Sequence, residues 1–185
     1  MQLVVYGRDD LDTLRDMAER SFSAIPNRHL TKATYNTTSF PPQYSGIIVH
    51  FYPVANSDTL YLYWQITPSL QPYYRHAVGS FIKRYLNHEG TTSAAYKLKS
   101  LNYVTSLSTN VFMDTDSYTL YTVQIELTDE GVRNVSGVIR ILFQYIVRFQ
   151  SINMSEFNRL WLDFVSVSQI RFDYSERSTP INYVR

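Results

Sequence analysis

The clearest pattern along the chain is an alternation of apolar and polar side chains between residues 59 and 67. Side chains two residues apart in a strand share a face, so this stretch predicts an amphipathic strand lying on a core. Alternation recurs over residues 118–127, and the polar stretch 103–113 before it predicts a hairpin partner, with the turn at residues 114–117. The predicted core face of the first strand consists of Leu60, Leu62, Trp64 and Ile66.

Two short apolar runs without alternation predict two further strands. The first is Leu3-Val-Val-Tyr6, which ends at Gly7, and the second covers residues 46–52. Continuous apolar runs of this length are typical of buried strands. Both are therefore expected to pair within a sheet.

Apolar residues spaced three and four apart predict the helices. Asp9 or Asp10 is expected to cap the first helix, and Pro26 to stop it. Thr91 or Thr92 is expected to cap a short helix over residues 93–100, and Thr128 a long one. The predicted apolar stripes are Leu11, Leu14, Ala18 and Phe22; Val78, Phe81, Ile82, Tyr85 and Leu86; Val135, Val138, Ile139, Leu142, Ile146 and Phe149; and, after a capping box at Asn153–Glu156, Phe157, Leu160, Trp161, Phe164 and Val165.

The order of these elements predicts an α+β fold. Residues 27–45 are rich in hydroxyl and amide side chains, contain a Pro-Pro pair and lack periodicity, which indicates a linker between residues 1–26 and 46–185. The expected order is β-α, then β-β-α-α-β-β-α-α. Sequential strands favour antiparallel pairing, so we expect an antiparallel sheet with helices packed on one face.

Composition narrows the function classes. The formal net charge is +1, so no electrostatic argument favours a nucleic acid or an anionic membrane as a partner. No apolar run approaches the ~18 residues of a membrane span. The chain has no cysteine, which excludes disulfides, thiol catalysis and cysteine-ligated metals, and favours a cytoplasmic over a secreted protein. The charged helix after residues 1–6 is not typical of a signal peptide.

Catalytic motifs are missing from the sequence. The four histidines have no second histidine or carboxylate at zinc-ligand spacing, and neither His-Glu-x-x-His nor His-x-x-Glu-His occurs. No nucleophile elbow, phosphate loop or dinucleotide fingerprint is present. We therefore expect no metal or other cofactor in this chain and no self-contained enzyme. His88, at a helix end, either satisfies local carbonyls and the helix dipole or contacts a ligand.

Several strings along the chain resemble insulysin-type M16 metallopeptidases. Residues 1–14 resemble the closing strand and helix of that family's first domain, and residues 59–68 resemble the opening strand of its second domain. Leu86-Asn-His-Glu-Gly-Thr-Thr-Ser93 matches the family's His-Glu-Gly corner, and Leu98–Tyr103 and Ile125-Glu-Leu-Thr-Asp-Glu-Gly131 follow in the family order. The resemblance covers nearly the whole chain.

This resemblance implies a fragment of a zinc peptidase without the catalytic motif. In the family, zinc is bound by a His-x-x-Glu-His motif in the first domain, upstream of residue 1, and the second domain binds none. That second domain carries an exosite, where the N-terminus of a peptide substrate is anchored and adds to an edge strand. Carried over to this chain, the anchoring residues are His88, Glu89 and Gly90, and the augmented edge is Leu107, Ser108 and Thr109. At positions 91–92 and 108–109 this chain has bulkier residues than the family pattern. This difference predicts a narrower exosite.

The expected function is a non-catalytic, substrate-handling segment of an M16 peptidase that degrades short peptides. Its expected partners are peptide substrates and the remaining domains of the same peptidase. Because the resemblance implies a truncated second domain, exposed apolar surface and a homodimer are also expected. The alternative is a stand-alone peptide-binding or scaffolding module without peptidase activity.

Overall fold

The computed structural model divides the chain into two compact units. One consists of residues 35–166, and the other of residues 1–34 and 167–185. The structure describes residues 3–31, 40–52, 57–176, 179 and 182.

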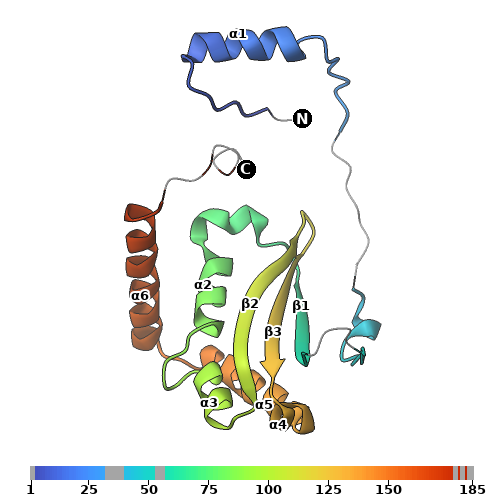
Figure 1. Ribbon diagram of the computed structural model, residues 1–185, viewed down its shortest axis with the longest axis vertical. Coiled ribbons are helices and arrows are strands. Elements are labelled where there is room, and N and C mark those ends of the chain that lie inside the picture. Colours follow the sequence, from blue (N-terminus) through green and yellow to red (C-terminus); the bar gives the residue numbers. More distant parts are fainter. Residues whose placement is uncertain (1–2, 32–39, 53–56, 177–178, 180–181, 183–185) are drawn as a thin grey trace. The chain divides into compact units, whose positions relative to one another are not determined.

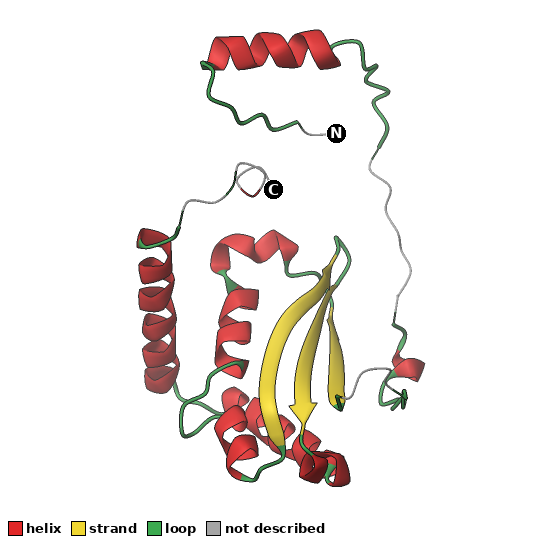
Figure 2. Ribbon diagram, viewed as in Figure 1, coloured by secondary structure: helices red, strands yellow, loops and turns green. Residues whose placement is uncertain are grey.

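The larger unit contains an antiparallel sheet of three strands (Figures 1 and 2). Strands β1 (Thr59–Ile66), β3 (Thr119–Leu127) and β2 (Val104–Asp114) lie side by side in the order β1-β3-β2. In the register, Leu62 and Thr109 both lie opposite Val123 of the central strand. The amphipathic strand and the hairpin predicted from the alternation are confirmed.

Along the chain, helices lie before β1, between β1 and β2, and after β3. The predicted helix 128–149 is divided at Asn134, whose backbone (φ −130°, ψ 39°) is not helical. The helices of the larger unit that the structure describes are the 3-10 helices Pro42–Tyr44 (η1) and Gln71–His76 (η2), and the α-helices Val78–Leu86 (α2), Ala94–Ser100 (α3), Asp129–Arg133 (α4), Val135–Gln150 (α5) and Met154–Asp173 (α6), the last of which continues beyond residue 166.

One face of the sheet forms the core with helices α2, α3 and α5. Val123 and Ile125 on the central strand and Leu98 of α3 are fully buried, as are Val138 and Leu142 of α5. Burying a large aliphatic side chain contributes about 1.5–3 kcal/mol, so each of these residues stabilises the unit. The α+β architecture with helices on one face is as predicted.

The opposite face of the sheet carries aromatic and polar side chains. Tyr61 and Tyr63 stack on each other at 6.4 Å between ring centroids, and Tyr63 meets Phe112 edge-on at 5.6 Å. Both tyrosines are about half exposed. The alternation of the sequence therefore separates a packed face from an open one.

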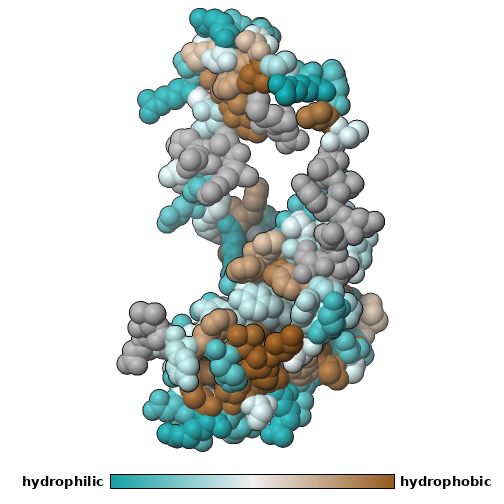
Figure 3. All heavy atoms as spheres, turned by 90° about the vertical axis from the view of Figure 1, so that its right-hand side faces the viewer, coloured by the Kyte–Doolittle hydropathy of each residue, from teal (hydrophilic) through white to brown (hydrophobic). Residues whose placement is uncertain are grey.

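The two predicted strands made of continuous apolar runs are wrong. Residues 3–6 and 46–52 have no strand pairing, and Val4 (63% exposed) and Ile48 (70% exposed) are typical of their side chains. A strand needs a neighbour for its N–H and C=O groups, and neither run has one among the described residues. Seen from the side of β1, hydrophobic side chains gather on the surface of the larger unit (Figure 3). Exposed apolar surface was expected, whereas dimerisation stays a prediction.

The smaller unit contains helix α1 (Leu11–Phe22). Asp10 caps it, accepting a hydrogen bond from the Thr13 amide at 2.8 Å. This hydrogen bond lowers the pKa of the Asp10 carboxyl. The predicted cap is thus confirmed, and the helix ends at Phe22, with Ser23 as its C-cap, before Pro26. Of the predicted linker 27–45, residues 32–39 lie outside the described residues.

Candidate functional site

The His-Glu-Gly corner is the loop between α2 and α3. Asn87 is the C-cap of α2, and Ser93 is the N-cap of α3, where its hydroxyl accepts from the Tyr96 amide at 3.1 Å. The cap predicted at Thr91 or Thr92 is therefore wrong, because it is the Ser93 side chain that reaches the first turn. Gly90 stabilises the loop by accepting a bond from the Ser93 amide at 2.8 Å.

Glu89 is held by a cation from the next helix. Its carboxylate lies 2.6 Å from the Lys99 ammonium, and the two side chains are 65% and 40% exposed. The hydrogen bond from Lys99, and then its charge, lower the pKa of Glu89. Glu89 is therefore a carboxylate at neutral pH, with an ammonium group already bound to it.

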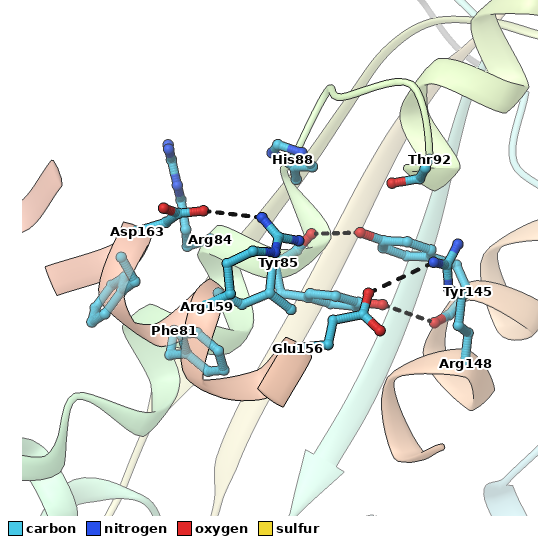
Figure 4. A pocket seen from close by; sticks show the side chains of 12 residues that line it. Phe81, Arg84, Tyr85, His88, Thr92, Tyr145, Arg148, Glu156, Arg159 and Asp163 are labelled. Carbon is cyan, nitrogen blue, oxygen red and sulfur yellow. Dashed lines mark hydrogen bonds and ion pairs between the residues drawn. The ribbon is translucent and has the colours of Figure 1, made fainter. Parts of the chain in front are cut away.

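His88 points to a different side of the corner. It lines a small hollow between α2, α5 and α6 (Figure 4). A Cβ atom at Gly90 would meet the imidazole of His88, so the glycine leaves space for this ring. His88 and Glu89 are thus exposed neighbours with different surroundings.

The floor of the hollow is a pair of stacked tyrosines. Tyr85 and Tyr145 lie 4.6 Å apart with their rings 6° from parallel, and each hydroxyl donates to the other residue's backbone carbonyl at 3.4 Å. Burial raises the pKa of both hydroxyls, so they stay neutral. At the rim, Arg148 lies 3.7 Å from Glu156 and Arg159 lies 3.3 Å from Asp163 (Figure 4).

The predicted edge, Leu107-Ser108-Thr109, lies in β2, which pairs with β3 and is an edge strand of the sheet that the described residues form. The Asn87 amide donates to the Thr109 carbonyl at 3.3 Å from outside the sheet. In an antiparallel pair, the backbone groups of alternate residues point to alternate sides. Leu107 and Thr109 therefore present their N–H and C=O groups away from β3. Thr109 is nevertheless 0% exposed, since its side chain lies on the core face, opposite Val123, and the Asn87 amide covers its carbonyl.

The structure thus brings the corner and the edge strand together, and the contact between them is Asn87. Neither Asn87 nor Lys99 was predicted as a site residue. Lys99 follows Glu89 by ten residues, across a loop and a new helix, so no helical spacing connects the two. The one local signal was that Asn87 directly precedes the corner.

A second corner holds the start of β2 in place. The Thr128 amide donates to the Tyr103 carbonyl at 3.0 Å, and the Thr128 hydroxyl accepts from the Gly131 amide at 3.1 Å and donates to the Asn102 carbonyl. Asn102 itself has a positive φ of 55°. A Cβ atom at Gly131 would collide with the backbone carbonyl of Tyr103. The Leu-Thr-Asp-Glu-Gly string therefore packs the backbone at the start of α4 directly against the backbone that precedes β2.

The side chains that the structure describes do not fit a zinc site. No group of three or more His, Cys, Asp or Glu side chains that could hold a metal ion occurs within the described ranges. Nor does any helix in the part of the chain that the structure describes combine the length and apolarity needed to cross a membrane.

Comparisons with known proteins agree with this architecture. The chain is 28% identical over 184 residues to insulin-degrading enzyme-like 1, peroxisomal, of Arabidopsis thaliana, matching 100% of this chain and 19% of that protein. It is 27% identical over 190 residues to nardilysin of Rattus norvegicus, covering 100% of this chain and 16% of the relative. The chain thus spans less than a fifth of the length of these relatives.

A solved structure and a family model match as well. The crystal structure of pitrilysin superposes on 97% of this chain and 19% of its own, with a TM-score of 0.85 at 20% identity, which shows the fold. The family model described as the peptidase M16 inactive domain matches residues 1–160. The resemblance to insulysin-type M16 peptidases is confirmed, and the chain belongs to the family of peptidase M16 inactive domains.

Proposed function

We propose that this inactive domain handles peptide substrates by anchoring their N-termini at the corner between α2 and α3. The observation that carries the proposal is the exposed carboxylate of Glu89, which already holds an ammonium group at 2.6 Å. The α-ammonium of a peptide is the same chemical group. His88, which is exposed, and Gly90, which is partly buried, complete the corner.

The neighbouring edge strand supports a peptide that continues beyond its first residue. Leu107 and Thr109 direct backbone groups away from β3, and an extended peptide can meet such groups by adding a strand. Ser108, whose side chain lies on the opposite face, would contact alternate side chains of the peptide. The anchoring contacts are thus to backbone and N-terminus, which suits short peptides of varied sequence.

The corner offers binding and no bond cleavage. Insulin-degrading enzyme-like 1 and nardilysin are much longer than this chain. We therefore assign peptide cleavage, and the zinc ion that the family resemblance implies, to other domains of a larger peptidase. The partners of this domain are then those domains and the peptides they cut.

The test is peptide binding to the purified chain, measured by fluorescence anisotropy with peptides that differ only in N-terminal acetylation. Free N-termini are expected to bind, and Glu89→Gln to weaken their binding roughly three- to tenfold, because a charge-assisted hydrogen bond is lost. Acetylated peptides should not respond to this substitution. Glu130→Gln is the matched control, since Glu130 also forms an exposed ion pair, with Arg133 at 2.8 Å. Equal binding by the wild-type chain and Glu89→Gln would disprove the proposal.

The complete peptidase provides a second test. There, Glu89→Gln is expected to raise the KM for peptides and to leave the zinc content unchanged. Zinc binding at one equivalent, or peptide cleavage, by the 185-residue chain alone would contradict the assignment of catalysis to other domains.

A further inference from the structure

Both anchor points of the proposed peptide site are filled by groups of the chain that have the chemistry of a peptide: an ammonium group at the first and an amide at the second. At the first, Lys99 places its primary ammonium 2.6 Å from the Glu89 carboxylate. Lys99 is fixed on α3, so this ammonium is an intramolecular competitor with a high effective concentration. A peptide α-ammonium has to displace it.

At the second anchor point, Asn87 supplies an amide. Its side chain donates an N–H to the Thr109 carbonyl at 3.3 Å, which is the bond that the backbone of an added strand would make. Thr109 is 0% exposed although it lies on an edge strand. The edge is therefore shut at this residue.

The contact between Asn87 and Thr109 leaves two polar atoms without hydrogen bonds. Asn87 Oδ1 and Thr109 Oγ1 are buried and have no hydrogen-bond partner among the described residues. Buried polar atoms without partners are unfavourable, so this cover is less stable than a fully bonded one. A peptide backbone carries both a donor and an acceptor and can exchange with a side chain that uses only its donor.

We infer that Asn87 and Lys99 hold the peptide site closed by standing in for a backbone amide and an N-terminal ammonium, and that they set which peptides enter. This inference rests on the proposed function. The two residues act on different parts of the ligand. Lys99 competes only with a charged N-terminus, whereas Asn87 competes with any extended backbone.

The test compares single and double variants with free and acetylated forms of one labelled peptide. Lys99→Ala is expected to tighten binding of the free form about two- to fivefold and to leave the acetylated form unchanged, as fits an exposed ion pair. Asn87→Ala is expected to tighten both forms about two- to tenfold, because the Thr109 carbonyl becomes available. The two effects should combine in the double variant.

Matched controls are available on the same elements. Lys97→Ala removes a neighbouring cation of α3 that makes no ion pair with Glu89. Lys83→Ala removes a bond from α2 to the Asn110 side chain, at 2.9 Å, that leaves the backbone of β2 untouched. Both controls should bind as the wild type does. Asn87→Ser, which keeps a polar group at this partly buried C-cap, repeats the Asn87 test in case Asn87→Ala fails to fold.

The outcomes separate the inference from the proposed function. If the wild type binds free peptides through Glu89 and neither Asn87→Ala nor Lys99→Ala tightens binding, the site is open and the inference is wrong. If no variant, the double variant included, binds a free peptide, the proposed function fails. Tightening by Lys99→Ala that is equal for free and acetylated peptides would also overturn the assignment of Lys99 as an N-terminus mimic.

Discussion

The two glycine corners of this domain have similar sequences and opposite characters. In His88–Gly90, a Cβ atom on the glycine would meet the movable imidazole of His88, and the charged side chain beside it is exposed. In Leu127–Gly131, a Cβ atom would meet the fixed carbonyl of Tyr103, and the threonine cap bonds to the backbone on both sides. The contacts of the first corner are made by exposed, movable side chains, whereas those of the second fix one stretch of backbone against another. Acidic residues next to glycine therefore do not by themselves indicate a binding site.

The largest effect that separates the corners is expected from Gly131→Ala. The new methyl group has to push apart α4 and the residues before β2, because the Tyr103 carbonyl is backbone and cannot rotate away. Overpacking of this kind costs about 1–3 kcal/mol, and this substitution is expected at the upper end. Urea unfolding of the purified variant measures it. A decrease in the free energy of unfolding below about 0.5 kcal/mol would mean that the contact between Gly131 and the Tyr103 carbonyl can adjust to an added methyl group.

A smaller loss is expected from Thr128→Ala. The substitution removes the N-cap of α4 and the bond to the Asn102 carbonyl, and N-cap losses are typically about 1 kcal/mol. Thr128→Ser, which keeps the hydroxyl, should recover most of this stability in the same unfolding assay. Failure of serine to recover it would assign the effect to the lost methyl group.

The pH dependence of peptide binding tests the role of the exposed carboxylate in the first corner, which the second corner does not share. The Lys99 hydrogen bond lowers the pKa of Glu89 below its usual value near 4.5. The stabilisation that the Glu89–Lys99 pair contributes to the folded domain is therefore fully present above pH 4.5. It is lost as the pH falls through the lowered pKa of Glu89. In Lys99→Ala the pKa should return toward 4.5, so binding of a free peptide should be lost at a higher pH than in the wild type. Anisotropy titrations between pH 3 and 6 measure the two midpoints, and identical midpoints would contradict this prediction.

The smallest effect on stability is expected from Gly90→Ala. The imidazole of His88 can rotate away from the new methyl group, so the change should stay within about 0.5 kcal/mol in either direction. Urea unfolding beside Gly131→Ala makes the comparison direct. Equal losses in the two variants would remove the distinction between the corners.

Much of the fold could be predicted because helix and strand periodicity is local. The alternation over Leu60–Ile66 predicts β1, and the spacing of Phe81, Tyr85 and Leu86 predicts α2. The apolar run of residues 46–52 was misassigned as a strand because hydrophobicity alone does not supply a pairing neighbour.

For the proposed site, the family resemblance predicts the corner and the edge strand, and the structure shows which groups contact them. Lys99 meets Glu89 only because the loop and the Ser93 cap orient α3. Asn87 meets Thr109 across 22 residues, because α2 packs beside β2. No sequence spacing encodes either contact.

By itself, then, the sequence determined the three paired strands and the positions of most helices, the absence of cysteine and of a catalytic zinc motif, and the family to which the chain is similar. Only the tertiary structure decided which apolar runs remain unpaired and which groups fill the predicted anchor points. The physical reason is that periodicity and capping depend on residues a few positions apart, whereas pairing and burial depend on neighbours that folding brings together.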